Sequence, residues 1–159
     1  MMKEVINVDF TMKKFDTSKM DTWTKEQWKE WGGEPEDNKG FQILLVNDNK
    51  FYLEIMGIYY NEETGNMFFG FDTQNKLERD INIQFGRWKI DESIYNLSRE
   101  KPQYLEKCSV VRGFQRSVER TYLETWDMIT IDINILDVET NLSIREFKFQ
   151  IEKRLIQVF

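Results

Sequence analysis

The sequence predicts a mainly β fold (a β-rich α+β class), in which an antiparallel meander closes as a barrel or sandwich and carries one or two short helices. The composition supports this. Aromatic residues make up 14% of the 159 residues, whereas alanine, the strongest helix former, is absent. Several segments also alternate apolar and polar residues with a period of two, which is typical of half-buried strands. The length fits one domain spanning residues 1–159.

The N-terminal part of the chain predicts a strand followed by a helix. Residues 6–13 alternate apolar and polar side chains, as a half-buried strand does. Thr24 and Gln27 then have the spacing of a capping box, in which the Thr24 hydroxyl accepts a hydrogen bond from the Gln27 amide. Gly32 suits the left-handed position that ends a helix. We therefore expect a helix of about two turns between Thr24 and Gly32.

Two hairpins are predicted next. The apolar runs 41–46 and 51–60 flank the polar residues 47–49, and the segment 61–66 contains Gly65, which suits a positive φ in a second hairpin loop. Residues 67–71 continue the sheet beyond that loop. The register that places the apolar side chains of the first hairpin on one face pairs Leu45 with Phe51, Ile43 with Leu53 and Phe41 with Ile55.

The middle of the chain gives weaker signals. Residues 81–85 alternate as a strand, and Trp88 and Ile90 extend it past Gly86. Residues 91–97 are compatible with one helical turn, and the pair at 101–102 indicates a loop. Residues 104–114 have an extended pattern. The segment 117–126 fits helical spacing as well as strand spacing, so both readings stay open.

The C-terminal hairpin has the clearest β pattern. Residues 129–135 place isoleucines on one face, and residues 146–151 alternate in the same way after the loop 139–141. A three-residue loop then sets the register. The predicted pairs are Ile133 with Phe147, Ile131 with Phe149, Asp132 with Lys148 and Asn134 with Glu146.

The composition excludes several kinds of chemistry. Histidine is absent and Cys108 is the single cysteine, which excludes Ser-His-Asp and Cys-His catalysis, histidine-ligated zinc sites and an internal disulfide. No glycine-rich phosphate loop is present, so we expect no cofactor. The net charge of −6 argues against charge-driven binding to duplex nucleic acid or anionic membranes. The polar start and single cysteine favour a cytoplasmic location.

A first candidate surface lies around the predicted helix. Tryptophan is the commonest hot-spot residue of protein interfaces, and the nearby loop is acidic. The residues concerned are Trp23, Trp28, Trp31, Glu34, Glu36 and Asp37. In the alternative reading, the tryptophans plug one end of the barrel and the acidic residues form a solvated loop.

A second candidate surface alternates cationic and aromatic residues. If residues 112–122 form a strand, these side chains point one way and could follow a phosphate backbone while bases stack on the rings. They are Arg112, Phe114, Arg116, Val118, Arg120 and Tyr122. In the alternative reading, the arginines pair with neighbouring glutamates on a solvated face.

The third candidate is Asp132 together with Glu146 and Lys148. On the predicted hairpin this set locally resembles the PD-(D/E)xK nucleases, in which an Asp and a Glu-x-Lys lie on adjacent antiparallel strands. That resemblance implies carboxylates that hold Mg²⁺ and a lysine that helps to activate water. It covers only the hairpin, and the flanking helices of those nucleases are not evident. A surface ion pair between Asp132 and Lys148 is the alternative.

These observations lead to four predicted functions, given in order of preference. The first is a small stoichiometric binding protein, such as an inhibitor or immunity-type protein, whose acidic surface would meet a protein partner. The second is a binder of single-stranded nucleic acid or nucleotides through residues 112–122. The third is a β-barrel that holds a small ligand. The fourth is the Mg²⁺-dependent nuclease. We expect a binding protein rather than an enzyme, with no membrane partner.

Overall fold

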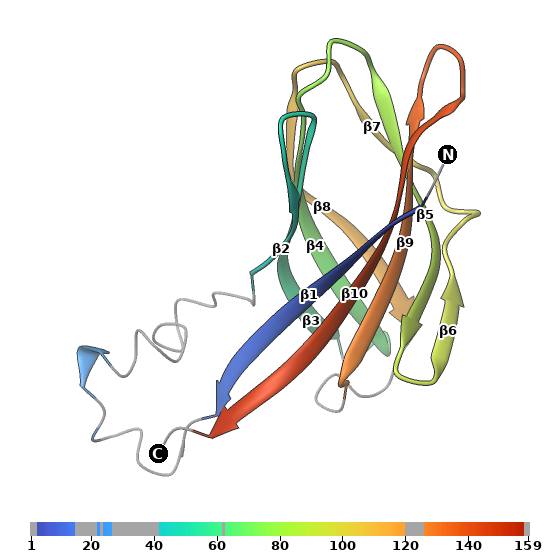
Figure 1. The fold of residues 1–159 in the computed structure, drawn as a ribbon. Coiled ribbons are helices and arrows are strands. Elements are labelled where there is room, and N and C mark those ends of the chain that lie inside the picture. The colour runs from blue at the N-terminus through green and yellow to red at the C-terminus, as the bar shows by residue number, and fades with distance from the viewer. Residues whose placement is uncertain are drawn as a thin grey trace.

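The computed structural model describes residues 3–14, 22, 24–26, 42–61, 63–119 and 126–157, and the strands among them form two β-sheets (Figure 1). The strands within them are β1 (Lys3–Lys14), β2 (Ile43–Asn47), β3 (Phe51–Asn61), β4 (Asn66–Asn75), β5 (Ile81–Ile90), β6 (Ser93–Asn96), β7 (Gln103–Leu105), β8 (Val110–Glu119), β9 (Met128–Asp137) and β10 (Ser143–Gln157). The mainly β prediction is confirmed.

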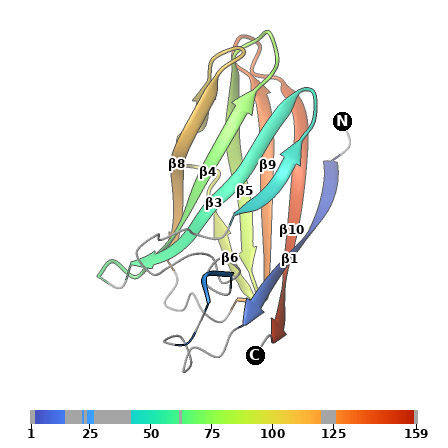
Figure 2. The same cartoon turned by 90° about the vertical axis from the view of Figure 1, so that its left-hand side faces the viewer.

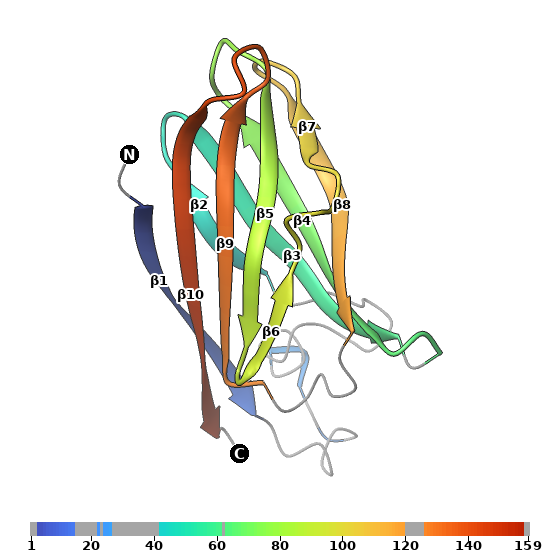
Figure 3. The same ribbon diagram turned by 90° about the vertical axis from the view of Figure 1, so that its right-hand side faces the viewer.

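The two sheets contain different parts of the chain. The first, called sheet A, has the strand order β1-β10-β9-β5-β6, and β7 also pairs with β5 (Figure 3). The second, called sheet B, has the order β2-β3-β4-β8 (Figure 2). Among the described residues no strand of one sheet pairs with a strand of the other. The architecture is therefore an open sandwich rather than a closed barrel.

Aromatic side chains from both sheets fill the space between them. Phe69 of β4 meets Trp88 of β5 nearly edge-on, with ring centroids 4.8 Å apart, and Phe71 lies 5.3 Å from Phe85. Phe51 of β3 stacks on Phe147 of β10 at 6.4 Å. Each of these rings is at most 2% exposed. The unusual aromatic content of the sequence is thus used to join the sheets.

The C-terminal hairpin has the predicted register. Ile133 pairs with Phe147, Ile131 with Phe149, Asp132 with Lys148 and Asn134 with Glu146. The N-terminal strand is confirmed as β1, but it pairs in parallel with β10, from Lys3 opposite Glu146 to Lys14 opposite Gln157. The fold is therefore not a pure antiparallel meander, because the first and last strands lie side by side.

The predicted register of the first hairpin is wrong by two residues. Ile43 pairs with Ile55 instead of Leu53, and Phe41 lies outside the described residues. The difference begins at the turn, where Asn47 pairs with Tyr52, and a bulge at Leu45 then shifts the pairing by one residue, so that Leu45 and its neighbour Val46 are both buried. The turn itself is built on Asp48, whose Oδ1 accepts hydrogen bonds from the amides of residues 50 and 51. The five described members of the predicted buried face are buried: Ile43, Leu45, Phe51, Leu53 and Ile55.

Other local predictions had mixed outcomes. The second hairpin loop is confirmed, with Gly65 at φ 70°. Residues 91–97 form no helical turn: Asp91, at φ 51°, begins a tight turn into β6. Residues 103–114 are extended but are interrupted by a turn between β7 and β8. Residues 117–119 belong to β8, whereas 120–125 lie outside the described residues.

The predicted helix after Thr24 is described only in part. Lys25 and Glu26 are helical, and residues 27–41 lie outside the description. Within the described ranges, no helix is long and apolar enough to cross a bilayer.

Candidate functional site

A polar groove of about 770 Å³ lies on the outer face of sheet A. Its floor is formed by β5, β9 and β10, and the β5–β6 turn closes one end. Thr130 is at the centre, paired with Lys89 of β5 on one side and with Gln150 of β10 on the other. The volume is in the range of ligand and peptide sites on proteins.

A β-bulge in β5 places two cations in this groove. The side chains of Ile81, Ile83 and Phe85 point into the core, so strict alternation would send residues 87 and 89 inward as well. The register shifts between Phe85 and Trp88, which reverses the alternation. Trp88 is therefore fully buried, and Arg87 and Lys89 are exposed on the outer face.

Lys148 of β10 completes a set of three cations. It lies opposite Asp132 of β9, and the bulged residues of β5 lie on the other side of Asp132. Among the residues that the structure describes, none of Arg87, Lys89 and Lys148 forms an ion pair or a side-chain hydrogen bond. We call these three residues the cation zone.

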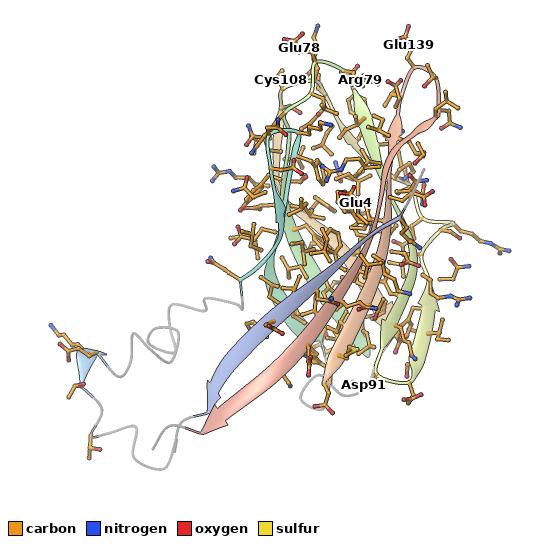
Figure 4. All side chains as sticks on the ribbon, viewed as in Figure 1. Glu4, Glu78, Arg79, Asp91, Cys108 and Glu139 are labelled. Atoms are coloured by element: carbon orange, nitrogen blue, oxygen red, sulfur yellow. The ribbon has the colours of Figure 1, made fainter. Side chains whose placement is uncertain are left out.

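Carboxylates line the end of the groove at the β5–β6 turn. They are Asp91, Glu92 and Asp127, called here the carboxylate zone. Figure 4 shows Asp91 at this end of the sandwich, opposite the end that carries Glu78 and Glu139. Asp91 Oδ1 accepts hydrogen bonds from the amides of Asp127 (2.8 Å) and Met128 (3.0 Å), which joins the turn to the start of β9.

Lys153 lies beside the carboxylate zone but is engaged elsewhere. Its ammonium is 4.7 Å from the centre of the Trp126 ring, and that ring stacks on Phe10 at 6.3 Å. Burial lowers the pKa of Lys153, and the nearby Asp127 and Asp91 offset this only in part. The lysine therefore anchors the loop before β9 to β1 and β10.

Asp132 occupies the floor of the cation zone. Its Oδ1 is 3.4 Å from Lys3 Nζ, is shielded from solvent and accepts no hydrogen bond from the described residues. The predicted constellation is partly assembled, because Asp132 faces Lys148 and Glu146 lies two pairs further along, opposite Asn134. In the described part of the chain, no three acidic or cysteine side chains come together as a metal site would require. The nuclease reading stays a prediction.

The predicted cationic and aromatic stripe is divided between two environments. Arg112 is exposed, but Phe114 is only 8% exposed and packs on Phe71 and Phe85. A bulge at Gly113, at φ 72°, separates them. The ring of Phe114 therefore belongs to the core and is not presented for stacking with a base.

Arg116 of the same stripe makes most of its contacts with other residues of the fold. Its guanidinium lies over the rings of Phe85 and Phe114 at 5.3 and 5.4 Å, donates to the Lys101 carbonyl at 2.9 Å and pairs with Glu100. Burial lowers its pKa, and Glu100 opposes that shift. Arg120 and Tyr122 lie outside the described residues.

The tryptophan and acidic surface also lies outside the description. Its members are Trp23, Trp28, Trp31, Glu34, Glu36 and Asp37.

Sequence reasoning missed most of the groove. Arg87, Lys89 and the carboxylate zone carry no motif, and they meet only through the pairing of β5 with β9 and β10. The one available signal was the break in alternation at Gly86, where Phe85 and Trp88 are both apolar. No known protein family, curated protein or solved structure matches the chain.

Proposed function

We propose that the protein is a small stoichiometric binding protein, of the inhibitor or immunity type, that recognises a protein partner through the groove on sheet A. One observation carries the proposal. Arg87, Lys89 and Lys148 lie together in a preformed groove without forming an ion pair with any described residue. Charges that the fold leaves uncompensated on a rigid surface are available to a partner and steer its association.

The charge pattern of the groove favours a protein over a nucleic acid. Four carboxylates line it beside the three cations, and one of them, Asp132, is inside the cation zone. A nucleic acid carries negative charge along its whole length, so part of it would meet like charge. A protein surface carries both signs and can complement both zones.

The groove is built for recognition with little rearrangement. The cations, Thr130 and Gln150 project from paired strands of sheet A, and the turn that carries Asp91 is joined to the start of β9 by two hydrogen bonds. A site whose backbone is held in this way loses little conformational entropy when it binds, which favours affinity. This suits an inhibitor, which must occupy a partner's surface in a fixed ratio.

The test is affinity capture from lysate of the native host, with two variants of equal net charge. The groove variant is Arg87→Glu with Lys89→Glu. The control is Arg99→Glu with Lys107→Glu, two exposed cations outside the groove. We expect the wild type and the control to retain one protein partner in fixed ratio, and the groove variant to lose it.

Two outcomes would overturn the proposal. In the first, the groove variant keeps the partner, or the control loses it as completely as the groove variant does. In the second, the bound material raises the ratio of absorbance at 260 and 280 nm and disappears on nuclease treatment, which would identify nucleic acid as the partner.

A further inference from the structure

The two charged zones of the groove are separated along the direction of β5. Arg87 and Lys89 lie on the strand, and the carboxylate zone begins at Asp91, where the turn into β6 starts. At about 3.3 Å per residue along β5, Arg87 is roughly 13 Å from Asp91 and Lys89 is roughly 7 Å from it. The longer distance is comparable to the Debye length of about 10 Å at 0.1 M salt, so the two ends of the groove present opposite charge to a ligand.

Exposed apolar side chains flank β5 on both sides of the groove. Ile94 of β6 pairs with Lys89 and is 59% exposed, and Met128 lies beside Asp91 and is 43% exposed. Both line the groove. An apolar group placed here would remove their surface from water, as the centre of a protein interface does.

From this layout we infer that the groove accepts an extended segment of the partner protein with three parts in order. Acidic residues lie on the cation zone, an apolar residue lies between Ile94 and Met128, and basic residues lie on the carboxylate zone. The inference rests on the proposed function and names the chemistry of the partner at the same groove. Charge complementarity determines the order of the three parts, because a segment with charges of one sign would be attracted by one zone and repelled by the other.

The test uses four synthetic probes and isotope-labelled full-length protein at low ionic strength. The first peptide has two glutamates, a Gly-Leu-Gly spacer and two lysines. The second has the same composition with the charges alternating, so that only their order differs. The third replaces the lysines by glutamates, and the fourth probe is an oligothymidylate. Binding is measured from the backbone amide shifts of the protein.

We expect the first peptide to bind about tenfold more tightly than the second, because its order allows about three exposed ion pairs to form together. The shifts should be concentrated in residues 87–94, 127–132 and 148–150. Arg87→Glu with Lys89→Glu should lower the affinity about tenfold, and Arg99→Glu with Lys107→Glu should leave it unchanged. Added salt should weaken the binding.

Equal affinity of the two isomeric peptides would overturn the inference. So would tighter binding of the all-acidic peptide or the oligothymidylate, or no localised shift at millimolar peptide. The capture experiment separates the two proposals. If the groove variant loses a protein partner while the peptides show no preference, the proposed function stands and the chemistry inferred for the segment is wrong.

Discussion

The contact that joins the two sheets at Arg145 gives a quantitative prediction. Arg145 of β10 binds both carboxylate oxygens of Glu4 on β1 at 2.9 Å and Asp48 in the β2–β3 turn at 2.8 Å. Its guanidinium also lies 4.5 Å from the centre of the Phe147 ring. Arg145 thus links the edge of sheet A to sheet B, and Figure 4 labels Glu4 near the start of β1.

The size of the effect follows from exposure. The side chains of Glu4 and Asp48 are 44% and 37% exposed, so each ion pair contributes about 0.5–1 kcal/mol rather than the larger value of a buried pair. The contact with Phe147 adds about 0.5–1 kcal/mol. Arg145→Met keeps most of the packing volume, and we expect it to lower the free energy of unfolding by about 2 kcal/mol.

A double-mutant cycle isolates the inter-sheet part of this contact. Asp48→Asn removes the charge but keeps the oxygen that accepts the amides of Lys50 and Phe51, so the turn survives. Urea unfolding of the wild type, Arg145→Met, Asp48→Asn and the double variant, followed by tryptophan fluorescence, gives the coupling energy. We expect about 0.5–1 kcal/mol at pH 7. A coupling below about 0.3 kcal/mol would refute the reasoning, since additive variants do not interact.

The coupling should also depend on pH. Burial raises the pKa of Asp48, but the amides of Lys50 and Phe51 and the Arg145 guanidinium outweigh it, so the pKa lies below its ordinary value of 3.8. The hydrogen bond from Arg145 lowers the pKa of Glu4 below 4.5. A carboxylate whose pKa is lowered in the folded protein stabilises the fold at pH values above its ordinary pKa. This contribution is lost as the pH falls through the pKa of the folded state. The coupling should be complete above about pH 5 and decline towards pH 3. An unchanged value at pH 3 would contradict this.

Three further predictions concern single positions. Asn75 is fully buried, donates hydrogen bonds to the carbonyls of Arg79 and Glu106 and accepts one from the Leu77 amide. Asn75→Ala should therefore lower the free energy of unfolding, measured with urea, by about 2–4 kcal/mol. A loss under about 1 kcal/mol would show that water replaces these hydrogen bonds. Gly113→Ala, at φ 72° with open space around the Cβ, should cost about 1–2 kcal/mol from backbone strain alone, and an unchanged Tm would contradict this. The protein with Mg²⁺ should not nick a plasmid, whereas nicking that Asp132→Ala abolishes would establish the nuclease.

The comparison of two hairpins shows what apolar alternation can predict. A slip of one residue moves every side chain to the other face, but a slip of two keeps the faces intact. For β2 and β3, alternation predicted the buried face correctly and the register incorrectly, since nothing in the pattern revealed that Asn47 pairs with Tyr52 at the turn or that Leu45 is bulged. For β9 and β10, the loop length and the pairing of Asp132 with Lys148 supplied the missing constraint, and the register is confirmed.

Apolar alternation also does not predict which distant strands pair or which conformation a turn adopts. The alternation of residues 6–13 predicts a strand but carries no information about its partner, which is β10 at the other end of the chain, with Glu4 opposite Phe147. The reading of residues 91–97 as a helical turn failed because Asp91 adopts a positive φ. Aspartate tolerates that conformation better than most residues, and the Asp91 side chain compensates by accepting two amide hydrogen bonds from β9.

The groove could not be predicted from the sequence because it depends on the β-bulge in β5. Had β5 continued its alternation past Phe85, Arg87 and Lys89 would face the core, where unpaired charges cost several kcal/mol, and Trp88 would face water. Burial of Trp88 against Phe69 and Phe71 therefore requires the bulge, and the bulge in turn requires the two cations to lie outside. The same local defect that completes the aromatic core thus creates the cation zone on an otherwise acidic protein. Core packing and the proposed recognition surface are in this way two consequences of one register shift.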